Sequence, residues 1–207
     1  MCGKVHLFDF DGTLTTADTL LAFVAFARGR GALVGGLLRF APLLVLMKLR
    51  LYANYRVKQK FFSHYFKGMT LERFDTLCRD FAASHRHLLR PEGIDTLDRA
   101  LRQGCLVLVV SASVDNWVAP FFDSWLSRQP HDAPRLQVLG TQVEVADGKL
   151  TGRFLTPNCY GAEKVNRVKA VLTRPRAEYD IDAYGDSRGD KEMLAYADRA
   201  HYQPFRH

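Results

Sequence analysis

Apolar positions in this chain follow two different spacings. Short continuous apolar runs at 5–10, 106–110, 179–184 and 200–202 predict strands. Apolar residues recur every three or four positions over 20–27, 57–66, 71–81, 94–101, 118–126, 165–172 and 193–197, which predicts amphipathic helices. Asp18 is a predicted N-cap for the first of these helices, and Gly104 closes the helix that follows Pro91. The alternation of the two spacings predicts an α/β fold with a parallel, Rossmann-like sheet.

Other segments are less regular. Residues 136–145 and 149–154 are expected to form a hairpin that turns at Asp147-Gly148, and residues 127–134 are expected to form a loop. Glycines at 29, 31, 35 and 36 are expected to loosen the chain before the very apolar stretch 37–51. Because Arg39 and Pro42 interrupt that stretch, we predict no transmembrane helix there and leave an interfacial segment open.

The segment between the first and second core strands is all helical. It is about 80 residues long, far more than a simple crossover needs. We therefore predict an inserted helical cap at 15–100 and an α/β core made of residues 1–14 and 101–207.

Charge is unevenly distributed along the chain. The 207 residues are 47 % hydrophobic, enough for the core of one domain, and the net charge is +7. Residues 19–71 contain nine basic and no acidic residues, whereas the rest of the chain carries 20 basic and 22 acidic residues. All of the positive excess therefore lies in the predicted cap, mostly over 28–60. The two readings of this segment are a packed cap helix with a solvated basic face and a surface that docks on an anionic bilayer.

The four cysteines and seven histidines give no sign of a disulfide framework or a zinc site. No two cysteines are spaced as CxxC, so reduced, partly buried thiols are expected. His85 and His87 are two residues apart, which suits no shared helix face. Because the first predicted strand begins almost at once, we expect no signal peptide and a cytoplasmic location, with peripheral contact at the inner membrane surface left open.

Paired acids at the end of the first predicted strand are the clearest chemical signal. Asp9 and Asp11 follow an apolar run and precede a glycine, in the sequence Asp9-Phe10-Asp11-Gly12-Thr13. Burying two like charges there costs several kcal/mol each unless something positive lies between them. A divalent cation is the expected partner, because hard cations bind carboxylate oxygens.

Polar residues also follow two other predicted strands. Ser111 comes after the run 106–110, and Asp186 and Asp190 come after the run 179–184. Because the carboxyl ends of parallel strands meet at one crevice, we expect these residues to converge with Asp9. Lys164, near the start of its helix, is placed to neutralise phosphate or nucleophile charge.

This order of motifs resembles the haloacid dehalogenase superfamily of phosphohydrolases, in the subfamily IB branch that holds phosphoserine phosphatase and a phosphatidylglycerophosphate phosphatase. The resemblance rests on DFDGT at 9–13, Ser111, Lys164 and GDSRGD at 185–190. It implies that Asp9 attacks phosphorus and that Asp11 is the general acid and base. It further implies that Mg²⁺ is held by Asp9, Asp11 (through its carbonyl) and Asp186, that Ser111 and Lys164 hold the phosphoryl group, and that Asp190 supports this site.

The same resemblance suggests where substrate binds. The substrate-binding residues it implies are Gly12, Thr13, Asp18, Ala112, Ser113 and Asn116. Phosphoserine phosphatases have a Glu where this chain has Asp18 and a cap Arg near the position of Phe61-Phe62 here. Both departures argue against phosphoserine and leave a small-molecule phosphomonoester or a lipid phosphate as the substrate.

Three other functions are weighed against a hydrolase. A phosphotransferase or phosphomutase would keep the same site, and a non-catalytic basic binding module would not need its complete set of acids. Nucleic-acid binding is not expected, because the basic segment lacks a recognised reading motif. The sequence does not predict the oligomeric state.

Overall fold

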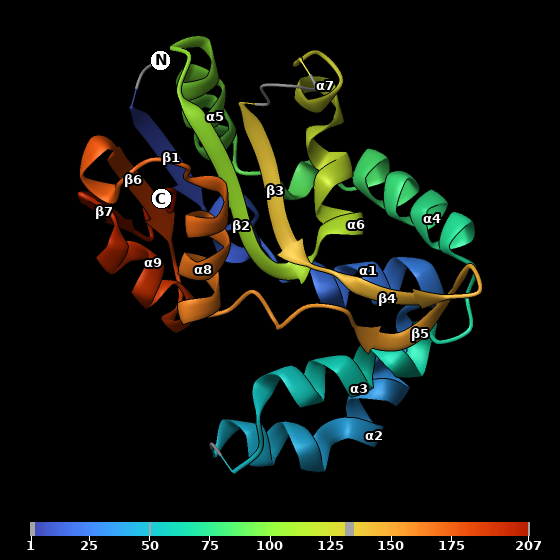
Figure 1. Ribbon diagram of the computed structural model, residues 1–207. Helices are drawn as coiled ribbons and strands as arrows, with labels where there is room; N and C mark the ends of the chain where they lie inside the picture. The colour runs from blue at the N-terminus through green and yellow to red at the C-terminus, as the bar shows by residue number, and fades with distance from the viewer. Residues whose placement is uncertain (1–2, 50, 131–134, 207) are drawn as a thin grey trace.

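A five-stranded parallel sheet forms the centre of the molecule, with strand order β3-β2-β1-β6-β7 (Figure 1). The computed structural model describes residues 3–49, 51–130 and 135–206. The strands of the sheet are β1 Lys4–Phe8, β2 Leu106–Val114, β3 Leu136–Thr141, β6 Asp180–Gly185 and β7 Arg199–Tyr202. The predicted α/β fold with a parallel sheet is confirmed.

Helices cover both faces of the sheet, and the alternation of side chains along β1 shows how. Val5 and Leu7 pack in one hydrophobic cluster with Val168 of α8 (Ala162–Val171) and Met193 of α9 (Lys191–Tyr196). Phe8 faces the other way, into a larger cluster that includes residues of α5 (Pro91–Arg102) and α6 (Asp115–Val118). Both faces are thus buried, as the continuous apolar run of β2 requires.

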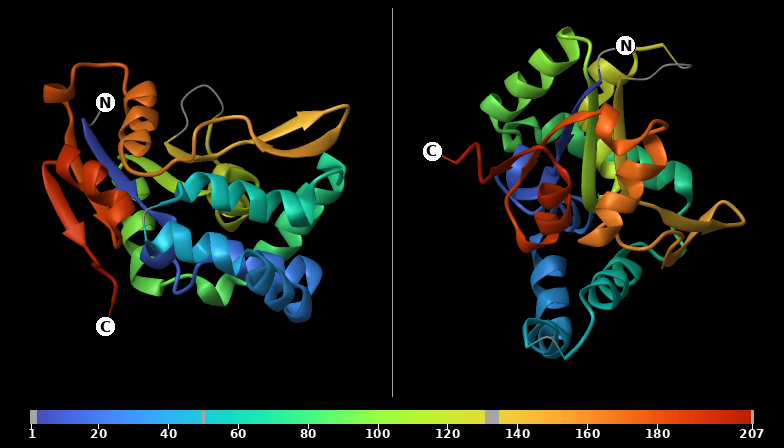
Figure 2. Two further views of the ribbon diagram at one scale, coloured as in Figure 1. Left: turned by 90° about the horizontal axis from the view of Figure 1, so that it is seen from below. Right: turned by 60° about the vertical axis from the view of Figure 1, so that its left-hand side comes forward.

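Four helices fill most of the chain between β1 and β2: α1 Thr19–Arg28, α2 Arg30–Lys48, α3 Asn54–Phe66 and α4 Leu71–Ser84. Asp18 caps α1 as predicted, because its side chain accepts hydrogen bonds from the backbone of Leu20 and Leu21. α2 and α3 pack together and project away from the sheet (Figure 2). Aromatic packing of Phe23 in α1 against Phe74 and Trp117 continues the core into these helices. We retain residues 15–100 as the proposed cap.

The glycine-rich and proline-containing stretch is more regular than the sequence indicated. The loosening expected at 29–36 and the interruption expected at Pro42 are both wrong, because α2 runs as one helix through them and breaks from α1 only at Gly29. A proline inside a helix costs about 3 kcal/mol. Packing against α3 offsets this cost: Gly36 and Phe40 are buried, and a Cβ at Gly36 would collide with the Tyr65 hydroxyl.

The hairpin predicted at 136–154 divides into two parts. Residues 136–141 form β3 of the main sheet, parallel to β2, and only β4 (Val143–Ala146) pairs antiparallel with β5 (Lys149–Phe154). The turn itself is as predicted, since Asp147 and Gly148 both have positive φ angles of 50° and 71°. Apolar alternation marks strands but not their partners, so the sequence did not reveal this division.

The helix predicted at 118–126 is also interrupted. α6 is followed by a tight turn at Ala119–Phe122 and by α7 (Asp123–Leu126), because Pro120 cannot donate the hydrogen bond that a continuous helix needs. β2 extends past 110 to Val114, with an irregular register after Val110. Part of the predicted loop, 131–134, lies outside the described residues.

Asp182 of β6 is a buried carboxylate that forms ion pairs away from the acidic residues that follow β1 and β6. It is 4 % exposed and accepts hydrogen bonds from Arg199 (2.9 and 2.8 Å) and His201 (3.0 Å). Burial raises the pKa of Asp182, but the hydrogen bonds and charges of these partners outweigh it and hold the pKa at about 2. A depressed carboxylate pKa adds stability above the unfolded value near pH 4, and that stability is lost as the pH falls towards 2.

Asp182→Asn is therefore expected to lower the free energy of unfolding by about 1–2 kcal/mol at pH 7. The expected loss is kept at this size because Arg199 is partly exposed, so solvent screens its attraction for Asp182. The difference from wild type should shrink between pH 4 and pH 2. Urea denaturation at several pH values measures this effect, and Asp95→Asn, at an exposed position of α5, is the matched control. A constant difference across this pH range would contradict the assignment.

Candidate active site

The turn after β1 places the first pair of acids at the carboxyl edge of the sheet. Asp9 ends the strand, and its backbone N–H donates to the carbonyl of Tyr184 in β6 (2.9 Å). A wide turn at Phe10–Leu14 follows, in which Gly12 has a φ of 81°. A Cβ at Gly12 would collide with the Asp186 carboxylate, so glycine is required both by the backbone and by this close approach.

Lys164 lies between two of the acids. This lysine of α8 is 1 % exposed, and its Nζ donates to Asp9 Oδ1 at 2.5 Å and to Asp190 Oδ1 at 2.6 Å. Burial lowers the pKa of Lys164, but the two carboxylates outweigh it and raise the pKa above its ordinary value. Lys164 is therefore a permanent cation that fixes one oxygen of Asp9 in the cavity described below.

The Asp9 carboxylate is buried and has little other support. Thr13 donates to its Oδ2 at 3.1 Å. Burial raises the pKa of Asp9 to about 7, against the opposing effect of the Lys164 charge. A further positive charge beside Asp9 would therefore stabilise its ionised form.

Asp11 points away from Asp9. Its Oδ1 accepts from the backbone N–H (2.7 Å) and hydroxyl (2.5 Å) of Thr19 at the start of α1. Its Oδ2 accepts from Ser113 at 2.5 Å and from Ser111 at 3.4 Å. Asp11 thus joins the first turn of the cap to the end of β2, within reach of the same crevice.

Asp190 and Asp186 complete the acidic group from the loop after β6. Asp190 Oδ2 accepts from the backbone N–H groups of Asp186 (3.2 Å) and Ser187 (3.0 Å) and from the Ser187 hydroxyl (2.8 Å). Burial raises the pKa of Asp186, with the Arg206 charge opposing it. Asp190 therefore holds both Lys164 and the loop that carries Asp186.

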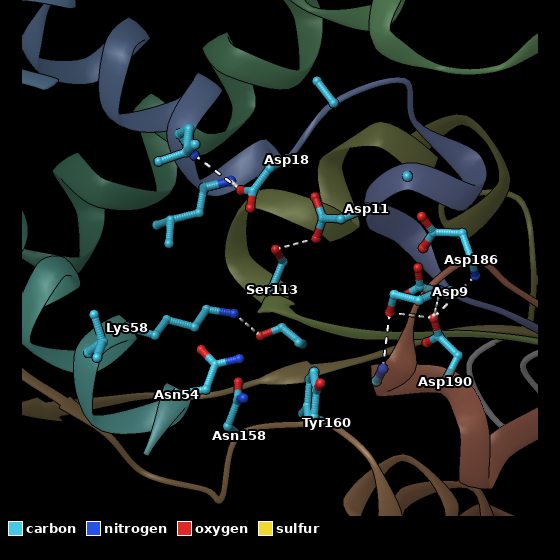
Figure 3. A pocket seen from close by; sticks show the side chains of 18 of the residues that line it. Asp9, Asp11, Asp18, Asn54, Lys58, Ser113, Asn158, Tyr160, Asp186 and Asp190 are labelled. Atoms are coloured by element: carbon cyan, nitrogen blue, oxygen red, sulfur yellow. Dashed lines mark hydrogen bonds between the residues drawn. The ribbon is translucent and has the colours of Figure 1, made fainter. Parts of the chain in front are cut away.

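A cavity of about 660 Å³ opens over these groups. Figure 3 shows Asp9, Asp186 and Asp190 together at one end, with Lys58 and Asn54 at the other. Leu20, Leu21, Leu37, Leu44, Met47, Val57 and Phe61, all from α1, α2 and α3, add apolar walls. The cavity is thus charged where it meets the sheet and apolar where it meets the cap.

Most of the residues expected at the site meet in this cavity. Asp9, Asp11, Gly12, Asp18, Ala112, Ser113, Lys164, Asp186 and Asp190 all line it. Thr13 lies just behind, bonded to Asp9. Ser111 and Ser113 are both buried, and the Ser111 Oγ accepts from the backbone N–H of Ser113 at 3.0 Å. Of the two, Ser113 lines the cavity, where the prediction had Ser111. Asn116 lies away from the cavity, and its amide donates to Asp75 of α4 at 2.7 Å.

Lys58 was missed by the sequence reasoning. It reaches from α3 to the sheet, where its Nζ donates to the carbonyl of Ala112. Burial lowers the pKa of Lys58, and the charges of Asp11 and Asp18 oppose this. From the sequence it was counted only as one of the nine basic residues of the predicted cap. One sequence signal indicates that it faces inwards: it lies next to Val57, on the helical stripe of α3.

Three carboxylates lie close enough together to hold a divalent cation between them. Oxygens of Asp9, Asp186 and Asp190 lie within 4.8 Å of one another. Lys164 neutralises part of this charge, and Arg206 pairs with Asp186 from the surface. Oxygen ligands and surplus negative charge suit Mg²⁺, so the residues present fit the predicted cofactor.

The described cysteines are not candidates for the chemistry. Cys78, Cys105 and Cys159 are buried, and Cys2 lies outside the described residues. Burial raises the pKa of Cys159 to about 11, so its thiol stays protonated.

Comparisons with known proteins identify the family and the fold. Residues 6–195 match the family model of the haloacid dehalogenase-like hydrolases. Protein CicA of Caulobacter vibrioides is 33 % identical over 202 residues, which are 96 % of this chain and 85 % of the relative. A Bordetella pertussis Tohama I protein of unknown function has a similar structure, with a TM-score of 0.77, 20 % identity and coverage of 94 % and 87 %. A phosphoserine phosphatase solved as a phospho-aspartyl intermediate analogue shares the fold, with a TM-score of 0.53, 20 % identity and coverage of 95 % and 84 %.

Proposed function

The chain belongs to the family of haloacid dehalogenase-like hydrolases, and from this premise we propose that it is a Mg²⁺-dependent phosphomonoester hydrolase in which Asp9 carries the phosphoryl group. The observation that supports the proposal best is the contact of Lys164 with Asp9 and Asp190 at the charged end of the cavity. A buried carboxylate with one oxygen held by a lysine and a cavity beside it would be suited to act as the nucleophile.

The first step transfers the phosphoryl group to Asp9. A carboxylate oxygen of Asp9 forms a bond to phosphorus as the bond from phosphorus to the leaving oxygen breaks. Asp11 gives its proton to the leaving oxygen, which departs as an alcohol. To do so its carboxyl group must turn from Thr19 and Ser113 towards the substrate.

The second step returns the enzyme to its starting state. Asp11, now ionised, removes a proton from water, and the water oxygen attacks phosphorus. The bond between phosphorus and the Asp9 oxygen breaks, releasing inorganic phosphate and restoring the carboxylate. Lys164 and Ser113 are placed to neutralise or hydrogen-bond the phosphoryl oxygens through both steps.

Mg²⁺ would be held by Asp9, Asp186 and the carbonyl of Asp11, and when bound it would supply Lewis-acid stabilisation of the phosphoryl charge. Asp190 would position Lys164 and the Asp186 loop, since both of its oxygens are already engaged. The close approach of Gly12 to Asp186 keeps the two ligand segments together.

Phosphate release from a panel of phosphomonoesters tests the proposal. With Mg²⁺ present, we expect release from at least one amino-acid, sugar, nucleotide or lipid phosphate, and we expect EDTA to reduce it at least 100-fold. Restoring Mg²⁺ should restore the rate, because without a cation the carboxylates and the phosphate repel each other. Phosphate that appears on an added alcohol instead of in solution would indicate a phosphotransferase, and unchanged release in EDTA would contradict the role of the metal.

A further inference from the structure

The outer face of α2 is apolar and uncovered. Val34, Leu38, Val45 and Leu49 are 55, 71, 57 and 62 % exposed. They follow one another at intervals of four, seven and four residues, so they form a single stripe that runs along α2 and ends at Leu49, the residue directly after the helix. A helix on the surface of a globular protein normally turns polar residues outwards.

The inner face of the same helix is also apolar, and it is covered. Gly36 and Phe40 are buried, and Leu37, Leu44 and Met47 line the catalytic cavity. α2 therefore has apolar residues on both of its faces, but only its inner face is covered by the rest of the protein. A helix that is hydrophobic all round needs an apolar environment on its other side as well.

Crossing a bilayer is not the role that the packing supports. α2 is the one described helix that is long and apolar enough to span a membrane, with a mean hydropathy of 1.6. However, Tyr65 of α3 donates to the carbonyl of Ala32 at 2.8 Å, and its hydroxyl lies against Gly36. A spanning helix would have to leave α3 and open the cavity, whereas a helix lying in the bilayer surface can keep these contacts.

The basic residues around the apolar stripe indicate what kind of surface covers it. Arg30, Arg39 and Lys48 of α2 are exposed, and no acidic residue occurs in residues 19–71. Each such basic residue near an anionic bilayer raises affinity about fivefold. A second copy of this chain would bring the same positive charges together, so an anionic lipid surface is the better complement.

We propose that α2 docks in the surface of an anionic bilayer with Val34, Leu38, Val45 and Leu49 inserted, and that the cavity behind it receives the apolar part of a lipid phosphomonoester. The binding of a lipid phosphomonoester in the cavity rests on the proposed phosphatase function. The cavity runs along α2 from Leu37 to Met47 and ends at Asp9, so one ligand with an apolar chain and a terminal phosphate can contact both ends. Lys58 lines the same cavity, at the end opposite Asp9 (Figure 3).

Cosedimentation with vesicles tests the docking. Wild type should bind phosphatidylglycerol vesicles at least tenfold more tightly than phosphatidylcholine vesicles, and salt should weaken the binding. Leu38→Asp/Val45→Asp should reduce binding about 100-fold or more, because two inserted apolar groups become charged. Leu155→Asp/Tyr202→Asp is the matched control, since both of its positions are exposed and apolar but lie outside α2; it should bind like wild type. Circular dichroism checks that each variant is folded.

Two activity measurements separate this inference from the proposed function. Leu38→Asp/Val45→Asp should hydrolyse a soluble ester such as p-nitrophenyl phosphate at the wild-type rate but lose at least tenfold on phosphatidic acid presented in vesicles. Wild type that hydrolyses the soluble ester but neither binds anionic vesicles nor acts on phosphatidic acid would overturn the inference alone. Wild type that binds the vesicles but releases phosphate from no substrate would overturn the phosphatase proposal. A dimer in solution that the Asp variant dissociates would show that the stripe is covered by a second copy instead.

Discussion

Asp9→Asn is expected to reduce phosphatase activity by about 10⁴-fold or more while the protein stays folded. The variant keeps the shape of the side chain, and its amide oxygen can still accept from Lys164 while its amide nitrogen faces the Thr13 hydroxyl. The loss arises because an amide cannot attack phosphorus. The neighbouring acids are already engaged. Asp11 is bonded to Thr19 and Ser113, and Asp190 has both oxygens engaged. Asp186 pairs with Arg206.

Stability gives an independent check on this variant. Burial raises the pKa of Asp9 to about 7, so its charged form is unfavourable in the folded, metal-free protein. A group whose folded pKa is raised contributes stability at low pH that is lost as the pH rises through that value. Asp9→Asn should therefore unfold in EDTA at a temperature no lower than wild type at pH 8.

Phosphate release, thermal unfolding and acid-quench trapping of phosphoprotein should be measured together. Wild type is expected to give an acid-stable phosphoryl label with a radiolabelled substrate, and Asp9→Asn to give none. Asp95→Asn removes the same charge from the surface of α5 and should match wild type in all three assays. Activity that survives Asp9→Asn would overturn the mechanism, whatever the substrate.

The sequence predicted what depends on local chemistry and periodicity. The strand β1, its terminal acids and the Gly12 turn form one contiguous segment, so their placement follows directly from residues 5–14. The convergence of Asp9 with Asp186 and Asp190 followed from the rule that parallel strands end at one edge. The N-cap at Asp18 followed from its side chain and the helical spacing after it.

Features that depend on packing between distant segments were not predictable in the same way. α2 survives Pro42 because Tyr65 and neighbouring residues of α3 pack on it, a contact that propensity cannot reveal. β3 pairs with β2, which is distant in the sequence, and not with the adjacent strand β4. Apolar alternation along β3 does not indicate which strand it pairs with. Ser113 and not Ser111 lines the cavity, since β2 continues to Val114 with an irregular register after Val110 and therefore ends beside Ser113.

The second large effect is expected at Lys164. Lys164→Met should destabilise the metal-free protein by about 3–5 kcal/mol at pH 7, because it leaves two buried carboxylates without their cation. Asp9 and Asp190 both lie within 2.6 Å of Nζ and are 5 % and 1 % exposed. Without Lys164 the folded-state pKa of each must rise, so the deficit should shrink as the pH falls from 7 towards 4 and the carboxylates take up protons.

Activity and a compensating variant distinguish electrostatics from lost packing. Lys164→Met should also lower phosphate release at least 100-fold, since a charge facing the phosphoryl group is removed. Lys164→Met/Asp190→Asn removes one of the two unpaired carboxylates and should recover part of the stability, a coupling that a double-mutant cycle in urea would measure. Lys169→Met, at an exposed position of the same helix, is the matched control and should stay within about 1 kcal/mol of wild type. Equal destabilisation of Lys164→Met at pH 7 and pH 4, with no recovery in the double variant, would show that Lys164 acts through packing and not by holding the charge of Asp9.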